Sequence, residues 1–199
     1  MQNIFWTSDT HFGHSTILEY CSRPFSSVEE MDEALIENWN KTIKPNDIVY
    51  HLGDVSWYGS NKTHYIFKRL NGKKRLIIGN HDHKKNLSPH FEYIVDYELL
   101  KVAGIQIAMM HYPILSWYGQ YHGVLHLHGH THNTIDNSGT TRFDVGVDSW
   151  GMSPVSLEQI IETLPSRLQQ DETKLQRPIS KFTALYKKAT KDDSRTKTE

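Results

Sequence analysis

Five short segments of this chain carry carboxylate, amide and imidazole side chains, the groups that bind divalent transition metals. Asp9 and His11 stand two residues apart, so in an extended segment both side chains point the same way, and His130 and His132 repeat that spacing. The full set of candidate ligands is Asp9, His11, Asp54, Asn80, His111, His130 and His132. These seven residues exceed what one tetrahedral ion needs and suit two ions.

Each segment follows a short apolar stretch that we expect to be a β-strand. The expected strands cover residues 3–8, 48–52, 75–78, 105–110 and 124–128. In α/β sheets the loops beyond the carboxyl ends of the strands form the ligand crevice, so the candidate ligands are placed to converge. Glycines before Asp54, Asn80 and His130 let the backbone turn sharply at these points.

Helices and one hairpin are expected around these strands. Ser27, with Glu30 three residues later, is a capping box, and an apolar stripe at helical spacing follows it. The stripe consists of Val28, Met31, Leu35, Trp39 and Ile43. Further expected elements are helices over 17–21, over 63–70 and from Ser156, a hairpin over 97–110 and a strand over 142–147.

The ordered pattern D-x-H, G-D, G-N-H-D, H and G-H-x-H resembles the calcineurin-like metallophosphoesterase superfamily. Its blocks span residues 9–132, and the stretch from Ser8 to His14 with Arg23-Pro24-Phe25 resembles small bacterial and phage members that lack a cap domain. The resemblance implies an α/β fold, a four-layer α/β/β/α sandwich of two mixed sheets.

The resemblance also implies a role for each block. Asp9, His11 and His132 would hold one metal ion, and Asn80, His111 and His130 would hold a second. Asp54 would bridge the two ions. His81 would be catalytic, as the acid that protonates the leaving oxygen or as a group that stabilises the transition state.

One position departs from the family pattern. Many members extend G-D to G-D-x-x-D, and the later Asp orients the catalytic His, but this chain has Trp57 there. The partner of His81 is therefore open, and Asp82 or a backbone carbonyl could serve.

Composition restricts the class of protein. The chain has 199 residues, of which 37% are hydrophobic and 23% charged, a globular balance without an apolar run long enough for a membrane span. The first residues lack a secretory pattern, and the single cysteine, Cys21, excludes an internal disulfide, so we expect a cytoplasmic protein.

Charge divides the chain into two parts. Acidic residues outnumber basic ones by 18 to 13 in residues 1–164, the expected metallophosphoesterase domain. In residues 165–199, which we expect to be a partly disordered tail with one short helix, basic residues outnumber acidic ones by 9 to 5. The acidic body argues against binding of long nucleic acid, whereas the tail leaves it open.

The sequence therefore predicts a binuclear metal-dependent phosphoesterase in which a metal-bridging hydroxide attacks the phosphorus. The expected substrate is a small phosphorylated molecule, most simply a phosphodiester of a nucleotide or a similar metabolite. Ligands without a thiolate favour Mn²⁺ first, with Fe, Zn²⁺ or Ni²⁺ as alternatives. The open alternatives are a phosphomonoesterase or protein phosphatase, a nuclease that uses the tail, and a non-catalytic binding scaffold.

Two groups of residues have competing interpretations. His126 and His128 alternate with leucines, and we expect them to be buried structural groups rather than ligands. The aromatic loop over 112–121 could stack a nucleobase, but packing against the body is the favoured interpretation.

Overall fold

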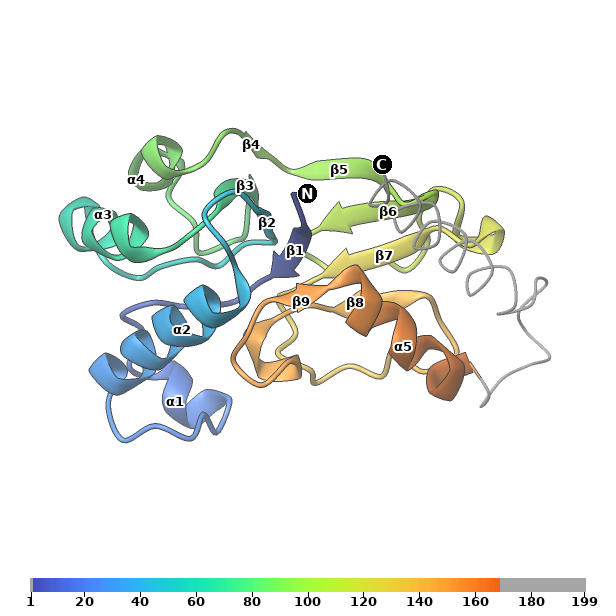
Figure 1. Ribbon diagram of the computed structural model, residues 1–199. Helices are drawn as coiled ribbons and strands as arrows, with labels where there is room; N and C mark the ends of the chain where they lie inside the picture. Colours follow the sequence, from blue (N-terminus) through green and yellow to red (C-terminus); the bar gives the residue numbers. More distant parts are fainter. Residues whose placement is uncertain (1, 169–199) are drawn as a thin grey trace, which may run out of the picture.

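The computed structural model describes residues 2–168, which fold into two mixed β-sheets stacked face to face, with helices on the outer face of the first sheet (Figure 1). This arrangement confirms the expected α/β sandwich. The first sheet has the strand order β4 (Ile94–Val95), β3 (Lys73–Ile77), β2 (Ile48–His51), β1 (Ile4–Thr7) and β9 (Val155–Ser156). The second sheet has the order β5 (Tyr97–Val102), β6 (Ile105–Met110), β7 (Leu125–His128) and β8 (Arg142–Asp144).

Most neighbouring strands in both sheets run parallel, so their carboxyl ends lie along the same edge of each sheet. Strands β1 to β4 run parallel, and only β9 is antiparallel to its neighbour. In the second sheet β6, β7 and β8 run parallel, while β5 and β6 form the predicted hairpin through Ala103 and Gly104. Both turn residues have positive φ, 49° and 81°, as a two-residue type I′ hairpin requires.

The main core lies between the sheets. On β1 and β2, alternate side chains face opposite sides, so Trp6 and Tyr50 point into the core between the sheets while Phe5 and Val49 point outward. Trp6 packs there with side chains from the second sheet, such as Leu127 and Phe143. Strands that are buried on both faces explain why these stretches are continuously apolar rather than alternating.

Three helices cover the outer face of the first sheet, on the left of Figure 1: α1 (Ile17–Tyr20), α2 (Val28–Thr42) and α3 (Ser60–Arg69). The predicted stripe on α2 is buried against this face, apart from the half-buried Val28. Ser27 caps α2 as predicted, accepting the N–H of Glu30 at 3.1 Å. The second bond of the capping box differs from the usual pattern. The Glu30 carboxylate accepts the backbone N–H of Ser26 at 2.8 Å instead of the backbone N–H of Ser27.

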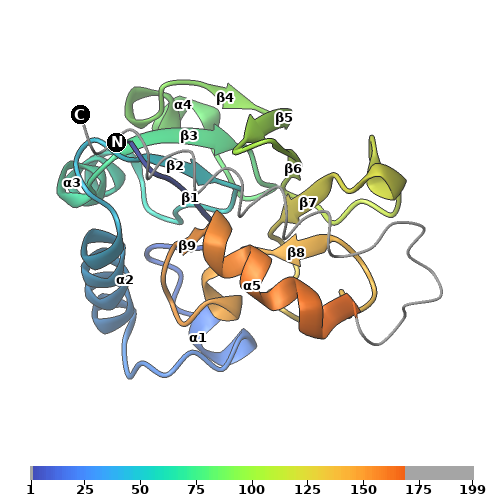
Figure 2. The same ribbon diagram turned by 45° about the vertical axis from the view of Figure 1, so that its right-hand side comes forward.

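The C-terminal helix α5 (Leu157–Leu168) begins where the sequence predicts. Ser156 and Gln159 exchange both bonds of a capping box, at 2.9 and 3.3 Å. Ile160 and Leu164 extend into the cluster between the sheets, and Figure 2 shows α5 beside β8 and β9. The helix continues beyond residue 164, the expected domain boundary, and the short helix predicted in the tail lies outside the described residues.

The outer face of the second sheet is covered by the loop between β6 and β7. Within it lies the 3-10 turn η2 (Gln120–His122), and Trp117 packs on Ala108 and Val124. The remaining short elements are α4 (Lys84–Leu87), η1 (Ser88–His90) and η3 (Val147–Ser149). Among the described residues, none of the helices combines the length and apolar character that crossing a bilayer requires.

We expect truncation of a leucine in the core between the sheets to destabilise the protein more than truncation of an exposed leucine. Leu127 is fully buried in it, so Leu127→Ala leaves a cavity and lowers the free energy of unfolding by about 2–5 kcal/mol. Leu115 is 88% exposed, so Leu115→Ala changes it little. Urea denaturation of both variants measures the difference, and equal losses would contradict this assignment of the core.

Candidate metal centre

The structure brings the sequence-predicted residues together where the parallel strands end. Asp9 and His11 follow β1, Asp54 follows β2, and Asn80 follows β3. From the second sheet, His111 follows β6, while His130 and His132 follow β7. Because the carboxyl ends of parallel neighbours lie along one edge, the loops of both stacked sheets meet there.

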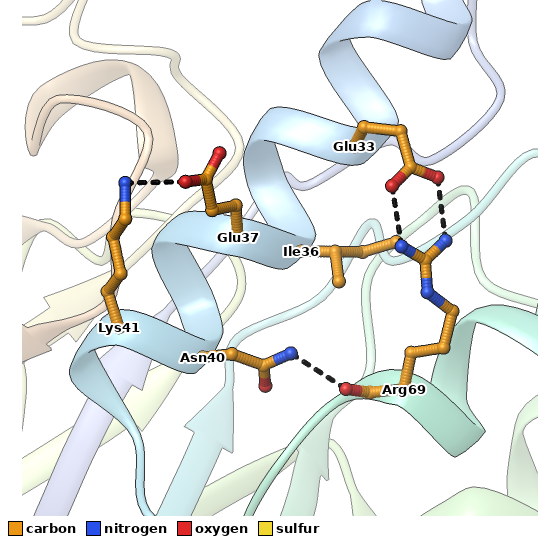
Figure 3. Close-up of a pocket in the computed structure, with 6 residues that line it drawn as sticks. All are labelled: Glu33, Ile36, Glu37, Asn40, Lys41 and Arg69. Carbon is orange, nitrogen blue, oxygen red and sulfur yellow. Dashed lines mark hydrogen bonds and ion pairs between the residues drawn. The ribbon is translucent and has the colours of Figure 1, made fainter.

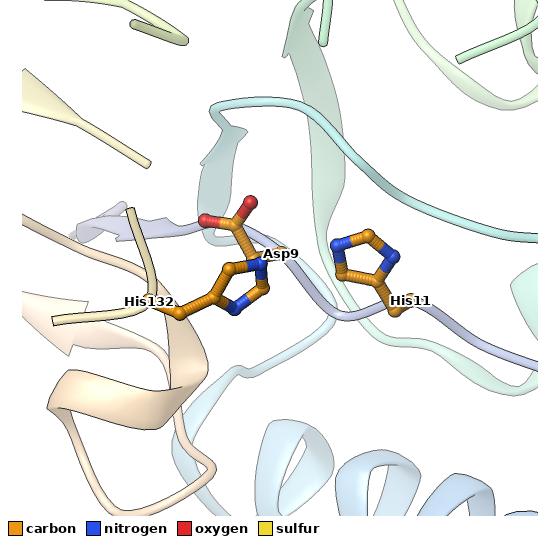
Figure 4. Close-up of side chains that lie close together, drawn as sticks. All are labelled: Asp9, His11 and His132. Carbon is orange, nitrogen blue, oxygen red and sulfur yellow. The ribbon is translucent and has the colours of Figure 1, made fainter. Parts of the chain in front are cut away.

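Two sets of donor atoms at the strand ends are close enough to hold a metal ion, and a third group, Cys21, His132 and Asp148, shares His132 with the first set. The first set is Asp9, His11 and His132, and the second is Asp54, His111 and His130. Within each set the donor atoms lie within 4.8 Å of one another. Figure 4 shows the first set, with the Asp9 carboxylate above the His132 ring and the His11 ring to their right. Asn80 adjoins the second set through a contact of 3.0 Å between its Oδ1 and His111 Nε2.

The backbone at these positions is unusual. Asp9, His11, Asp54, His130 and His132 all have positive φ, between 45° and 70°. Such left-handed conformations are disfavoured for residues with a side chain, and they concentrate at functional sites, where the surroundings hold them. Two bonds between neighbouring loops hold the loops of Asp9, His11 and Asp54, from Asp9 N–H to Gly53 O at 2.9 Å and from His11 N–H to Asp54 O at 3.1 Å.

The His11 ring has the properties of a metal ligand. Its side chain is buried, and neither Nδ1 nor Nε2 has a hydrogen-bond partner among the described residues. Burial lowers the pKa of His11 to about 2, so the ring is neutral and keeps a free lone pair. Buried polar atoms without partners are unfavourable, and a metal ion would give one of the two ring nitrogens a partner.

The Asp9 carboxylate also favours a cation in the first set. Its carboxylate is fully buried and accepts the backbone N–H of His130 at 3.0 Å. Burial raises the pKa of Asp9 to about 7, because loss of water around the charged carboxylate outweighs the attraction of His111 and His132. A divalent ion beside it would stabilise the charged form.

The second set has a similar shortage of positive charge. His111 Nδ1 lies 2.6 Å from Leu52 O, which can only accept, so Nδ1 carries the proton. Nε2 then faces two oxygen atoms, Asn80 Oδ1 at 3.0 Å and Asp54 Oδ2 at 3.5 Å. These three atoms repel one another unless a proton or a cation lies between them.

Asp54 lies between the two sets. Its Oδ2 is 3.7 Å from His11 Nε2 and 3.5 Å from His111 Nε2, while Oδ1 accepts the backbone N–H of His81 at 2.9 Å. Burial would raise the pKa of Asp54, but the interactions with His111, His81 and His11 outweigh it and hold the pKa well below its usual value. The carboxylate is therefore charged and shared between both sets.

Two glycines leave room for the carboxylates. A Cβ atom at Gly79 would collide with Oδ1 of Asp54, and one at Gly129 would collide with Oδ2 of Asp9 and with Ser8. No side chain fits at either position without displacing a carboxylate.

Asp82 does not serve as the partner of His81. Its carboxylate accepts three backbone N–H groups, those of Asp54 at 3.0 Å, Val55 at 2.8 Å and Gly79 at 2.8 Å. It therefore fixes the loop that carries Asp54 against the turn that carries His81. The His81 side chain instead packs against Trp57, with ring centroids 4.7 Å apart.

Sequence reasoning did not assign roles to Arg23 and Asp148, which support the first set. The buried Arg23 guanidinium forms two bonds of 2.8 Å with the Asp148 carboxylate and donates to the backbone oxygens of Asp9, at 2.7 Å, and Thr10, at 3.1 Å. Asp148 also accepts from His132 Nδ1 at 2.7 Å, so Nε2 of His132 is left as the free donor atom. The Arg23-Pro24-Phe25 stretch was the available signal, but nothing near Asp148 in the chain indicates its partner.

Asp148 also changes the protonation of His132. Burial would lower the pKa of His132, but the hydrogen bond to Asp148, together with Cys21 and the nearby Asp9 carboxylate, outweighs burial and raises the pKa to about 10. A metal ion must therefore displace a proton from this ring before it binds.

The other conspicuous histidines are structural, as expected. His126 lies on the outer face of the second sheet, where its Nδ1 lies 3.1 Å from Ala108 O and its Nε2 accepts from the N–H of Ile114 at 3.0 Å. His128 Nδ1 lies 2.8 Å from Gly129 O. Their buried nitrogens are satisfied by protein groups and are not aimed at the site.

Away from the strand ends, a surface hollow of about 610 Å³ lies between α2 and α3 (Figure 3). Its charged groups pair with one another, Arg69 with Glu33 and Lys41 with Glu37. This surface therefore offers no convergent set of free ligands, and the candidate chemistry lies at the strand ends.

The chain resembles known proteins over most of its length. A family model described as the calcineurin-like phosphoesterase superfamily domain matches residues 3–145. An uncharacterized protein of Methanocaldococcus jannaschii is 35% identical over 82% of this chain and 92% of its own length. The gene 66 protein of Mycobacterium phage L5 is 30% identical over 86% of this chain and 98% of its own length.

A solved structure agrees with the fold. The crystal structure of a protein of unknown function from Aquifex aeolicus superposes with a TM-score of 0.66 and is 30% identical. The match covers 82% of this chain and all of that one.

The raised pKa of His132 predicts proton-coupled metal binding. Apparent affinity for Mn²⁺ should rise with pH between about 6.5 and 8.5, by about tenfold per pH unit for each displaced proton. Asp148→Asn removes the charge that raises the pKa, so the slope should decrease. Calorimetric titrations at several pH values measure it. Glu33→Gln, which changes an ion pair between α2 and α3, is the control, and an unchanged slope in Asp148→Asn would contradict the role of Asp148.

Proposed function

Since this chain belongs to the calcineurin-like phosphoesterase superfamily, we propose that it is a binuclear metal-dependent phosphoesterase that hydrolyses a small phosphorylated substrate. The observation that carries the proposal is the sharing of Asp54 between two sets of metal-binding side chains. One charged carboxylate between two such sets is the arrangement that a pair of neighbouring divalent ions requires.

The proposed ligands follow from the geometry of the two sets. Asp9, His11 and His132 would hold one ion, and His111 and His130 would hold the other together with Asn80. Asp54 would contact both. Imidazole and oxygen donors without a thiolate support Mn²⁺ as the first candidate, with Fe, Zn²⁺ and Ni²⁺ as alternatives.

When bound, such ions supply a nucleophilic hydroxide and neutralise charge on the phosphate. Neutral histidine and asparagine ligands add no negative charge, so Asp9 and Asp54 are the two anionic ligands. A site with two divalent ions therefore keeps a net positive charge, which attracts an anionic ester.

His81 is the proposed proton donor. Its backbone N–H is held by Asp54 at 2.9 Å, next to the proposed ligand Asn80, while its side chain is exposed toward solvent. The ring therefore lies at the edge of the site rather than among the ligands. From there it can donate a proton to the oxygen of the departing alcohol.

The size of the space beside His81 supports a small substrate. A cavity of about 270 Å³ is lined by Ser56, Trp57, Asn80, His81 and His83. We favour a phosphodiester of a nucleotide or a similar metabolite. The acidic balance of residues 1–164 argues against long nucleic acid as the substrate of this domain.

Metal content tests the shared carboxylate. The purified protein should bind about two Mn²⁺ ions per chain. Asp54→Ala should lose both, because Asp54 is the ligand that the two ions would share. Metal analysis after dialysis measures the occupancy. His122→Ala, which removes an exposed imidazole from η2, is the control and should bind normally. Full loading of Asp54→Ala would exclude the bridging role.

Leaving-group dependence tests His81. We expect His81→Asn to keep both metals and to lose about 100-fold or more in kcat on an alkyl ester, whose leaving oxygen needs a proton. On a nitrophenyl ester the loss should be much smaller. Steady-state kinetics on both esters measure the contrast. Equal losses would indicate stabilisation of charge in the transition state, and no loss would remove His81 from the mechanism.

Truncation separates the body from the tail. Deletion of residues 170–199 should leave hydrolysis of a small ester nearly unchanged, since all proposed ligands precede residue 133. Kinetics on a nitrophenyl phosphodiester, together with circular dichroism of the truncated protein, provide the measurement. A selective loss of activity on oligonucleotides would instead favour a nuclease that uses the basic tail. Loss of activity on the small ester in a folded protein would show that the tail contributes to the site.

A further inference from the structure

An exposed tryptophan borders the cavity that contains His81. Trp57 is 48% exposed, although it is among the most apolar side chains of the chain. It lines the same 270 Å³ cavity as Asn80 and His81. A large ring left half in water beside a candidate site offers a surface for an apolar, planar group.

The Trp57 ring is held in one orientation. It stacks on the His14 ring with centroids 4.0 Å apart and planes 5° from parallel. His14 is itself tied to Thr16 by a bond of 2.7 Å, and the backbone N–H of Trp57 donates to Phe12 O at 2.8 Å, which fixes the chain that carries the ring. Because the ring is already ordered, a ligand that stacks on it loses little further entropy.

The polar lining of the cavity is compatible with a phosphoester. Ser56, Asn80, His81 and His83 contribute hydroxyl, amide and imidazole groups, and none of the lining residues is a carboxylate. An anionic ester therefore meets no like charge from the cavity wall. Tyr118, on the loop between β6 and β7, is also exposed, but it does not line this cavity.

We propose that this cavity binds a leaving group that carries a planar aromatic ring, such as a phenol or the base of a nucleoside, and that this ring stacks on Trp57. The inference rests on the proposed function, because the alcohol that receives a proton from His81 must lie on the His81 side of the phosphorus. Trp57 thereby selects esters by their leaving group. It acts through stacking and does not take part in the chemical step.

Two phosphonates that cannot be hydrolysed provide the test. Phenylphosphonate and methylphosphonate share one anionic head and differ in the ring. Calorimetry on the protein loaded with Mn²⁺ should show phenylphosphonate binding about tenfold more tightly, as expected for one stacking contact. Trp57→Ala should abolish the difference, Trp57→Phe should keep most of it, and Tyr118→Ala should keep all of it.

Other results would overturn the inference. Equal binding of the two phosphonates to the unchanged protein, or no binding of either, would exclude an aromatic subsite. A preference that survives Trp57→Ala but disappears in Tyr118→Ala would place the stacking surface on the loop between β6 and β7. Thermal unfolding followed by circular dichroism confirms that each variant is folded.

Hydrolysis assays on the same protein separate this inference from the proposed function. If esters are hydrolysed but the phosphonates bind alike, the phosphoesterase stands and the stacking site fails. If no ester is hydrolysed while the preference for phenylphosphonate depends on Trp57, the stacking site stands and the proposed activity fails.

Discussion

Two buried carboxylates, those of Asp9 and Asp54, constrain everything around them, because a buried negative charge requires hydrogen bonds and a positive partner. Asp9 follows β1 in the first sheet, yet it accepts the N–H of His130, which follows β7 in the second. Asp54 accepts the N–H of His81 from the next loop of its own sheet. Each bond draws a neighbouring loop toward the carboxylate, so the same two groups organise the loops and collect the imidazoles.

The cost of this arrangement lies in the backbone. Positive φ at residues such as Asp9, His11 and Asp54 is unfavourable for residues with side chains, and the surrounding structure must offset it. Asp82 contributes by accepting three backbone N–H groups around Asp54, and Arg23 contributes by donating to the carbonyls of Asp9 and Thr10. These polar side chains touch none of the proposed substrate positions, yet they hold the loops in the geometry that metal binding needs.

Much of the fold could be predicted because its signals are local. The apolar stripe of α2 and its Ser27 cap, the hairpin over 97–110, and the capping box at Ser156 each depend on residues close together in the chain. The short elements β4, β9 and α4 were missed, because β4 and β9 have only two residues each and α4 lacks a side-chain cap. Strand β9 exists only because β1 offers it an edge to pair with.

The sequence by itself determined which residues gather at the strand ends, since their types, their order and the glycines beside them specify local backbone turns. Tertiary structure alone decided how they are shared and supported. Arg23 and Asp148 are separated by 125 positions, and only packing of α1 and the loop after β8 against the Asp9 loop brings them together. Likewise, Trp57 beside His81 results from the meeting of two loops. Contacts of this kind depend on three-dimensional packing, which spacing along the chain does not encode.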